Sequence, residues 1–171
     1  FMNEVVDREP AQPTGFKRLD EAFYGGLRKG LYLIGAITSL GKTTLAIQMA
    51  DQIAQSGRDV IIFTLEMDAY ELMSKSISRI TYTKEMEACG KPRYAKTDIG
   101  ISDGTLYTGY NKAERKLIKE SITAYGEYAK HIYFKEGWMG EIGVEEIEKE
   151  IDRYIRIHEK KPVVFVDYFQ A

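Results

Sequence analysis

The sequence predicts an α/β domain whose mostly parallel sheet is covered by helices on both faces, and three observations support this fold class. The chain has 171 residues, of which 44% are hydrophobic and 29% charged, as in one ordinary globular domain. Short apolar runs of strand length recur along it, and amphipathic segments of helix length separate them. Strands that alternate with helices favour parallel pairing, because each helix returns the chain to the same end of the sheet.

The order of elements follows from the spacing of apolar residues. Residues 1–13 are polar and contain two prolines, so we expect an arm or linker before a domain that spans residues 14–171. Asp68 and Glu71 have the spacing of a capping box, which predicts where one helix begins. Helices are predicted where apolar residues recur at helical spacing, over residues 16–23, 44–55, 68–80, 113–125 and 144–155. Strands are predicted over the short runs of apolar residues at 31–35, 60–65, 131–135 and 163–167.

Residues 81–111 interrupt this pattern. Helical periodicity fades there, and breakers recur at Gly90, Pro92, Gly100, Gly104 and Gly109. We therefore expect a long loop, a kind of segment that often has a function. Tyr107, Tyr110 and Lys112 near its end could contact a nucleotide or DNA, although packing contacts are the simpler interpretation.

Composition excludes several classes of protein. Cys89 is the only cysteine and there are two histidines, too few for a disulfide framework or a multi-cysteine zinc site. The formal net charge is −2, so the chain has no overall basic character, which leaves room only for a local basic patch. No apolar run approaches the roughly 18 residues of a membrane span, and the first residues lack the pattern of a signal peptide. We expect a cytoplasmic protein without membrane contact.

Residues 36–43 read Ala-Ile-Thr-Ser-Leu-Gly-Lys-Thr, which has the spacing of a phosphate-binding P-loop with alanine in place of the first glycine. A predicted strand precedes this segment and a predicted helix follows it, which is the context that the motif requires. Lys42 is expected to reach the β- and γ-phosphates of ATP, and Thr43 to offer its hydroxyl to Mg²⁺. The alternative is an ordinary glycine turn with a solvated lysine. Backbone and side-chain contacts to the phosphates are assigned to Ser39, Leu40, Gly41, Lys42, Thr43 and Thr44.

Two carboxylates directly follow predicted strands. Asp167 ends the apolar run 163–166, the pattern of a Walker B strand, and is expected to hold Mg²⁺ through water; a turn-capping role is the alternative. Glu66 follows the run 60–65, where it could orient or deprotonate a water in line with the γ-phosphate. Spacing alone leaves open that Glu66 is only an acid in the first turn of the next helix.

Several segments occur in a characteristic order along the chain. They are Thr14-Gly15-Phe16-Lys17-Arg18-Leu19-Asp20, then Gly25-Gly26-Leu27, the P-loop with the threonine after it, Thr64-Leu65-Glu66-Met67, and Val166-Asp167-Tyr168-Phe169-Gln170. Together they resemble the RecA-like ATPase domain of DnaB-type replicative helicases, from about Thr14 to the end of the chain. In that family the glutamate of the Leu-Glu-Met segment is the catalytic base, so the resemblance makes Glu66, together with Lys42, the expected catalytic pair.

The resemblance implies a RecA-like P-loop NTPase core that uses ATP and Mg²⁺. It also implies a homo-hexameric ring that hydrolyses nucleoside triphosphate, translocates on single-stranded DNA, unwinds the duplex in replication and works with other replication proteins. The family's later strands, DNA-binding loops and arginine finger have no counterpart before Ala171, so we expect an incomplete domain that alone hydrolyses ATP slowly or not at all. Ile37 and Thr38 stand where the family often has Arg-Pro, and the segment 81–111 is longer than is typical.

Two other functions share part of this pattern. A recombinase- or clock-type RecA relative would have the same P-loop and strand-end carboxylates, and a nucleotide-switch module would bind without turnover. Glu66 argues against a pure switch, because binding alone does not need a carboxylate that activates water. The ordered Thr-Gly-Phe and Asp-Tyr-Phe-Gln segments favour the helicase over the recombinase.

Overall fold

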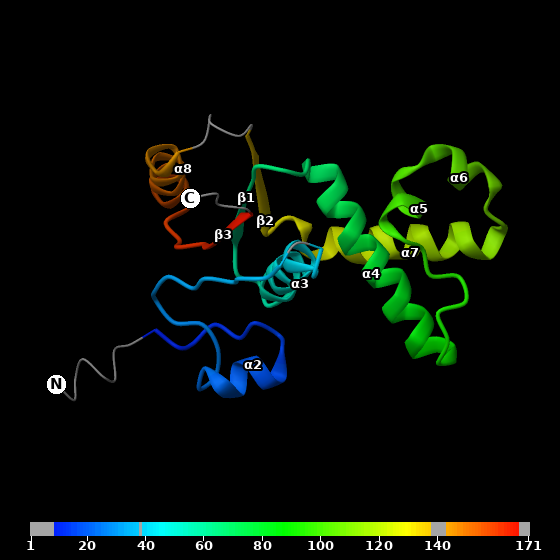
Figure 1. The fold of residues 1–171 in the computed structure, drawn as a ribbon, viewed down its shortest axis with the longest axis horizontal. Coiled ribbons are helices and arrows are strands. Elements are labelled where there is room, and N and C mark those ends of the chain that lie inside the picture. Colours follow the sequence, from blue (N-terminus) through cyan, green and yellow to red (C-terminus); the bar gives the residue numbers. More distant parts are fainter. Residues whose placement is uncertain (1–8, 38, 138–142, 168–171) are drawn as a thin grey trace.

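The computed structural model of the chain describes residues 9–37, 39–137 and 143–167, and Figure 1 shows the arrangement of its elements. The helices are α2 (Lys17–Ala22), α3 (Lys42–Gln55), α4 (Ala69–Cys89), α5 (Asp98–Ser102), α6 (Gly104–Gly109), α7 (Lys112–Ala129) and α8 (Val144–His158). The strands are β1 (Val60–Thr64), β2 (Ile132–Glu136) and β3 (Val163–Asp167). Among these residues no helix is both long enough and apolar enough to cross a membrane.

The three strands form a parallel sheet in the order β2-β1-β3, which confirms the predicted pairing. All of β1 is buried, as its continuous apolar run predicted for a strand with neighbours on both sides. In register, Thr64 at the end of β1 lies opposite Glu136 of β2 and Asp167 of β3. The carboxyl ends of all three strands therefore lie at one edge of the sheet.

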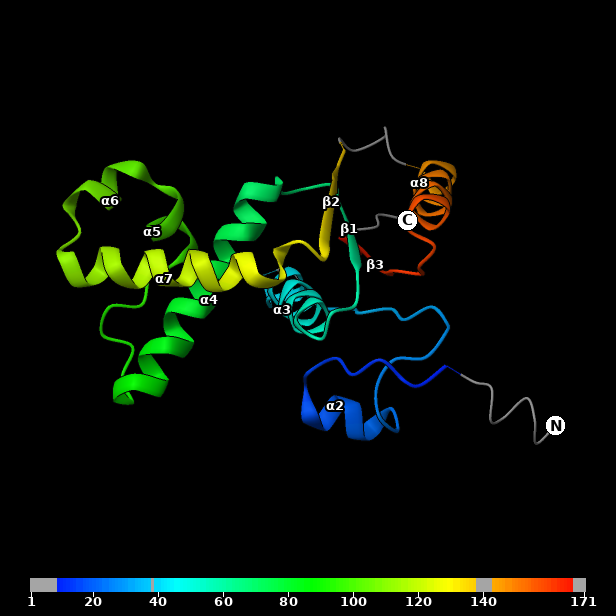
Figure 2. The ribbon, with the colours of Figure 1, turned by 180° about the vertical axis from the view of Figure 1, so that it is seen from behind.

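Helices cover both faces of this sheet, as predicted (Figures 1 and 2). Alternate side chains of β1 point to opposite faces. Val60 and Ile62 belong to the main core with residues of α3, α4 and α7. Ile61 and Phe63 belong to a smaller core, where they pack against Tyr154 of α8.

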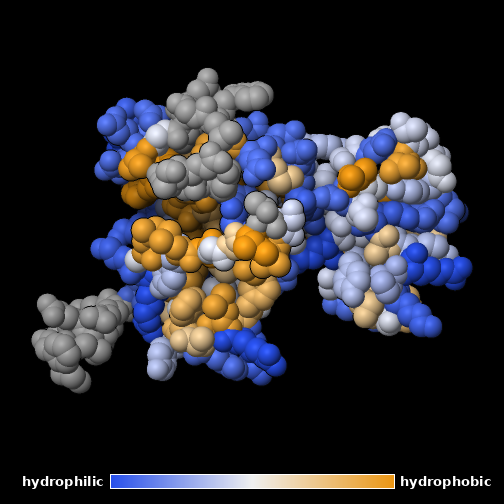
Figure 3. All heavy atoms as spheres, viewed as in Figure 1, coloured by the Kyte–Doolittle hydropathy of each residue, from blue (hydrophilic) through white to orange (hydrophobic). Residues whose placement is uncertain are grey.

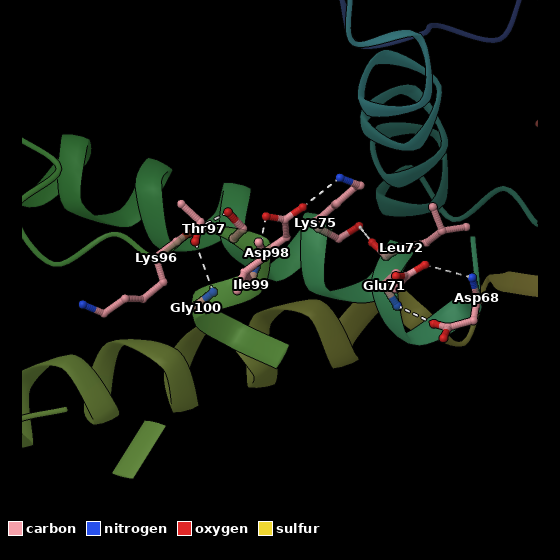
Figure 4. Close-up of polar contacts among 11 residues, drawn as sticks. Asp68, Glu71, Leu72, Lys75, Lys96, Thr97, Asp98, Ile99 and Gly100 are labelled. Carbon is pink, nitrogen blue, oxygen red and sulfur yellow. Dashed lines mark hydrogen bonds and ion pairs between the residues drawn. The ribbon is translucent and has the colours of Figure 1, made fainter. Parts of the chain in front are cut away.

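Capping boxes fix the starts of two of these helices. At α4 the Glu71 backbone N–H donates to Asp68 Oδ1 at 2.7 Å, and the Asp68 N–H donates to Glu71 Oε2 at 3.3 Å (Figure 4). Asn111 and Glu114 form the same reciprocal pair at the start of α7. Each box satisfies two N–H groups that a helix end would otherwise leave without an acceptor, so the prediction at Asp68 is confirmed.

The prediction of a long loop over residues 81–111 was wrong. Helix α4 continues to Cys89 and ends at Gly90, whose φ of 68° is the left-handed conformation that glycine adopts readily. The last turns of α4 are largely solvent-exposed, so they lack the apolar periodicity that marks a packed helix. Side chains of Thr97 and Asp103 cap the short helices α5 and α6, and such caps act locally without any periodic pattern.

Two ion pairs hold this helical segment to the rest of the fold. Lys75 of α4 contacts Asp98 of α5 at 2.8 Å, and Figure 4 shows the two side chains pointing toward each other. Lys96 contacts Glu114 of α7 at 2.5 Å. The partners are 23 and 18 positions apart along the chain, which is why spacing in the sequence did not indicate them.

The predicted buried strand at residues 31–35 was also wrong. Residues 31–37 form no strand in the structure, and the side chains of Leu31 and Leu33 are 87% and 88% exposed. Burial of an apolar strand needs cover on both faces of the sheet at the edge where it would pair. Residues 31–37 lack this cover because they pair with no strand of the sheet, and Val163 of β3 is likewise only half-buried and Val166 exposed. Apolar side chains consequently gather on the surface between α2 and α8 (Figure 3).

A tight turn precedes the sheet and explains the Thr-Gly-Phe segment. The Asp20 carboxylate accepts hydrogen bonds from the Thr14 N–H and hydroxyl, both at 2.7 Å, and from the Gly15 N–H at 3.1 Å. Thr14 is fully buried by this arrangement. A Cβ on Gly15, which has a φ of 84°, would lie 2.6 Å from the Gln52 side chain, so only glycine allows α3 to pack here.

Candidate nucleotide-binding site

The P-loop residues lie at the N-terminus of α3. Gly41 is the N-cap residue with a φ of 87°, and Ser39 has a φ of 64°. A serine in the left-handed region is strained, and such strain is often found at functional sites. No described side chain caps α3, and its first turn contains no acidic residue. The positive end of the α3 dipole is therefore not neutralised by an acidic residue of the helix's own first turn. Helix termini that bind anions have this property.

The side chains assigned to the phosphates differ in exposure. Lys42 and Thr43 are half-buried, whereas Ser39, Leu40 and Thr44 are exposed. On the opposite side of α3 the apolar residues Ile47, Met49, Ala50 and Ile53 are buried in the main core. This anchor fixes the helix from which Lys42 and Thr43 project. Thr38 lies outside the described residues.

Asp167 and Glu66 lie at the same edge of the sheet. Asp167 is 6% exposed, and its backbone carbonyl accepts a 3.0 Å hydrogen bond from the Leu65 N–H. The turn after β1 is tightened by Thr64, whose buried hydroxyl donates to the Met67 carbonyl and accepts from the Met67 N–H at 3.3 Å. Glu66 is exposed within this turn. The structure thus brings the two predicted carboxylate positions together, as parallel pairing requires.

Helix α3, which begins at the P-loop, packs against β1, β2 and β3. Residues 31–37, before the loop, form no strand. Of the two elements predicted to flank the P-loop, the structure therefore shows the helix and not the strand. Tyr168 to Gln170, the end of the Val-Asp-Tyr-Phe-Gln segment, lie outside the described residues.

The role of Glu136 in this region was not predicted from the sequence. Glu136, the last residue of β2, accepts a 2.7 Å hydrogen bond from the Ala69 N–H in the first turn of α4. This hydrogen bond joins the end of β2 to the start of α4, directly after the turn that contains Glu66. The only signal in the sequence was a third carboxylate at the end of a strand, and its partner could not be read from spacing.

His131 and the buried acid Asp59 form a hydrogen-bonded cluster outside this site. His131 Nδ1 lies 2.7 Å from Asp59 Oδ1, and the Tyr154 hydroxyl donates to Asp59 Oδ2 at 2.6 Å. Burial opposes the charged form of Asp59, but these hydrogen bonds together hold its pKa below the ordinary value. Asp59 precedes β1, so this cluster is at the amino edge of the sheet, away from Glu66 and Asp167. No catalytic role was predicted for His131.

A second buried acid lies between the helices of the main core. Asp51 of α3 is 1% exposed and pairs with Arg79 of α4, with 2.7 Å between its Oδ2 and the guanidinium Nη2. Burial raises the pKa of Asp51, and the nearby Arg79 charge opposes that rise. The pair joins α3, which carries the P-loop, to α4, which follows the Glu66 turn.

A metal ion at this site would need coordinating oxygen atoms from water or a nucleotide in addition to the protein side chains. Within the described residues no group of three or more His, Cys, Asp and Glu side chains is close enough to hold a metal ion. Thr43 and Asp167 supply hard oxygen atoms, which Mg²⁺ prefers, and this ion commonly completes its shell with water and phosphate oxygens. The donor chemistry of these two side chains therefore suits Mg²⁺.

Comparison with known proteins identifies the family. Residues 12–171 match the family described as the DnaB-like helicase C-terminal domain. The chain belongs to that family. This DnaB-like chain is 26% identical over 159 residues to the replicative DNA helicase DnaB of Helicobacter pylori, a match that covers 92% of the chain and 28% of the relative. It is 28% identical over 162 residues to a probable plasmid replicative DNA helicase of Chlamydia trachomatis, covering 94% of the chain and 31% of that relative.

A solved structure confirms the fold of the DnaB-like chain. This structure, described as an ATPase domain, aligns with a TM-score of 0.67 at 23% sequence identity, and the match covers 98% of the chain and 53% of that structure. The predicted RecA-like core, as part of a larger domain, is thereby confirmed. The chain spans about a third or less of the length of the two helicases from Helicobacter pylori and Chlamydia trachomatis.

Proposed function

We propose that the chain is the nucleotide-binding part of a replicative helicase motor, which binds ATP with Mg²⁺ and hydrolyses it to drive movement along single-stranded DNA and separation of the duplex. Membership of the DnaB-like family supports this proposal. The observation that carries it is that Glu66 and Asp167 lie at the carboxyl ends of two neighbouring parallel strands, and that α3, the helix that begins at the P-loop sequence, packs against both of these strands.

Each residue has a distinct role in this proposal. The N-terminus of α3, with residues 39–44, binds the phosphates, and Lys42 adds a positive charge to the β/γ region. Mg²⁺, when bound, neutralises charge that develops on the transferred phosphoryl group; Thr43 and Asp167 would hold it. Glu66 orients the attacking water and accepts its proton. Its exposure in the turn after β1 leaves the carboxylate accessible to that water.

The proposal extends to partners that the complete protein would need. DnaB-type replicative helicases act on DNA, and we propose single-stranded DNA as the track, a homo-hexamer as the active assembly, and the cytoplasm as the compartment. The activity of the chain by itself is expected to be slow, because an arginine supplied by a neighbouring subunit is worth on the order of 10³–10⁵ in rate in other NTPases.

Replacing Lys42 by alanine is expected to weaken binding of ATP with Mg²⁺ about tenfold or more, because a charge-assisted contact to the phosphates is lost. Titration calorimetry on the parent and the variant measures this change, and circular dichroism checks that the fold is retained. Lys17→Ala is the matched control, since Lys17 is an exposed lysine on α2, outside the P-loop. Equal affinities in parent and Lys42→Ala would exclude the P-loop as the nucleotide site.

A further inference from the structure

The helices α5 and α6 and the first turns of α7 form a lobe that projects away from the sheet (Figures 1 and 2). An open concavity of about 750 Å³ lies on this lobe, between the end of α6 and one face of α7. Its lining combines two tyrosines, Tyr107 and Tyr110, with four basic residues, Lys112, Arg115, Lys116 and Lys119. We call this surface the lobe concavity. None of these residues belongs to the proposed nucleotide site.

The basic residues of the lobe concavity occur at one face of α7 because the opposite face is buried. Leu117, Ile118 and Ser121 pack inward, which turns positions 112, 115, 116 and 119 toward solvent. Among the described residues that line the concavity, Glu120 is the single acidic one, so these side chains carry four positive charges and one negative charge, a net of +3. The whole chain has a net charge of −2, so this positive charge is concentrated locally.

A second acid on this part of α7, Glu114, is already paired. Glu114 lies among the basic positions of α7, where a free carboxylate would repel an anion. Its side chain instead pairs with Lys96 at 2.5 Å and accepts a 2.8 Å hydrogen bond from the Asn111 N–H. The fold therefore removes one repulsive charge from the surface.

The two tyrosine rings are held in place. Their centroids are 6.2 Å apart in an edge-on arrangement, and the Tyr110 hydroxyl donates to the Gly100 carbonyl at 2.9 Å. The Arg115 guanidinium donates to the Thr108 carbonyl at 2.6 Å and lies 5.5 Å from the Tyr107 ring centroid. The Lys96 ammonium lies 4.3 Å from the Tyr110 ring centroid, over one face of that ring. Tyr107 is therefore the ring for which we expect stacking, and a ring that is already ordered loses little conformational entropy when a ligand stacks on it.

A second concavity extends the surface along α7. It has a volume of about 340 Å³, shares Lys119 and Glu120 with the first, and continues to Lys84 of α4 and to Thr123, Ala124 and Glu127 of α7. The two concavities therefore form a continuous track along the helix and not an isolated pocket. An elongated anion fits this shape better than a compact one.

We propose that the lobe concavity binds the backbone and bases of single-stranded nucleic acid. Lysine and arginine side chains along a groove attract the phosphates, and ordered aromatic rings stack against bases without regard to sequence. A run of acidic side chains would use the positive charge but offers no aromatic bases that could stack on the tyrosines. The contact lies on α7, apart from the P-loop and the strand ends, and it does not depend on the proposed ATP hydrolysis.

The test is binding of a fluorescent oligothymidine of about 16 nucleotides to the chain, followed by anisotropy at several salt concentrations without nucleotide. The double variant Lys112→Glu/Lys119→Glu is expected to bind about tenfold or more weakly, with a smaller dependence on salt because fewer phosphates are neutralised. The variant Lys17→Glu/Lys161→Glu makes the same change in net charge at exposed lysines away from the lobe, and should bind like the parent.

Two further measurements separate the alternatives. Tyr107→Leu should weaken oligothymidine binding about fivefold or more if the ring stacks on a base, with thermal unfolding as the check on folding. A polyglutamate peptide should compete poorly. An equal loss in both charge variants, or effective competition by polyglutamate with no effect of Tyr107→Leu, would overturn the proposal; the second result would indicate an acidic protein partner. The oligothymidine measurement is made without nucleotide, so failure of the proposed nucleotide site would not change its outcome.

Discussion

Replacing Glu66 by glutamine is expected to lower kcat by about 10²-fold or more, while the affinity for ATP with Mg²⁺ changes little. A carboxylate that orients and deprotonates water acts on the transition state, whereas the bound nucleotide in its ground state does not depend on it. Glutamine keeps the shape and one hydrogen-bond acceptor but cannot take up the proton. The turn that contains Glu66 is held by Thr64 and Met67, so the substitution leaves the backbone unchanged.

Single-turnover hydrolysis and calorimetric affinity are the two measurements for this variant. They require a protein extended over the full length of the matched ATPase domain, of which the chain covers 53%. Glu71→Gln is a useful control, because Glu71 is a nearby exposed acid whose role is the capping box of α4. Unchanged hydrolysis in Glu66→Gln would reduce Glu66 to a helix-start acid and would favour a nucleotide switch without turnover.

Replacing Arg79 by alanine is expected to lower the free energy of unfolding by about 3 kcal/mol, measured by urea denaturation at neutral pH. The change leaves the buried carboxylate of Asp51 without its cation. Loss of the arginine also raises the pKa of Asp51 further in the folded state. A group with a raised folded-state pKa favours folding at low pH, so the deficit should shrink as the pH is lowered.

Two controls make this prediction specific. Lys75→Ala removes the pair with Asp98, whose side chains are 24% and 38% exposed, and should cost at most about 1 kcal/mol. Asp51→Asn added to Arg79→Ala should recover part of the loss, because it removes the unpaired charge. A loss for Arg79→Ala no larger than that for Lys75→Ala would mean that the α3–α4 pair contributes little to stability.

The sequence was most informative where neighbouring residues in the chain themselves determine the element. Strand β1 could be predicted because five successive apolar or β-branched residues need burial on both faces, and α4 could be placed because Asp68 and Glu71 cap it locally. Glu66 and Asp167 could be placed at one edge for a related reason, since parallel pairing aligns the carboxyl ends of strands.

The predictions that were wrong concern segments whose structure depends on residues far away in the sequence. Residues 31–35 have the composition of a buried strand, but burial also requires a strand partner and packing on both faces, which the local sequence pattern does not reveal. The helices α5 and α6 depend on single capping residues and on ion pairs such as Lys75–Asp98, which join distant positions. The partners of Glu136, Asp51 and Asp59 could not be predicted either, because they too are distant in the sequence.

The most direct test of a shared site is the effect of Mg²⁺ on ATP affinity, compared between the parent and Asp167→Asn. If α3, the Glu66 turn and Asp167 form one nucleotide site, Mg²⁺ should tighten ATP binding by the parent about tenfold or more. In Asp167→Asn most of this coupling should disappear, whereas affinity without Mg²⁺ should stay the same.

The Asp167 carbonyl that accepts from Leu65 belongs to the backbone and is unaffected by the change. Asp152→Asn, at an exposed position on α8, should couple like the parent. Equal coupling in the parent and Asp167→Asn would contradict a metal role for Asp167 and, with it, a single site at the carboxyl edge of the sheet.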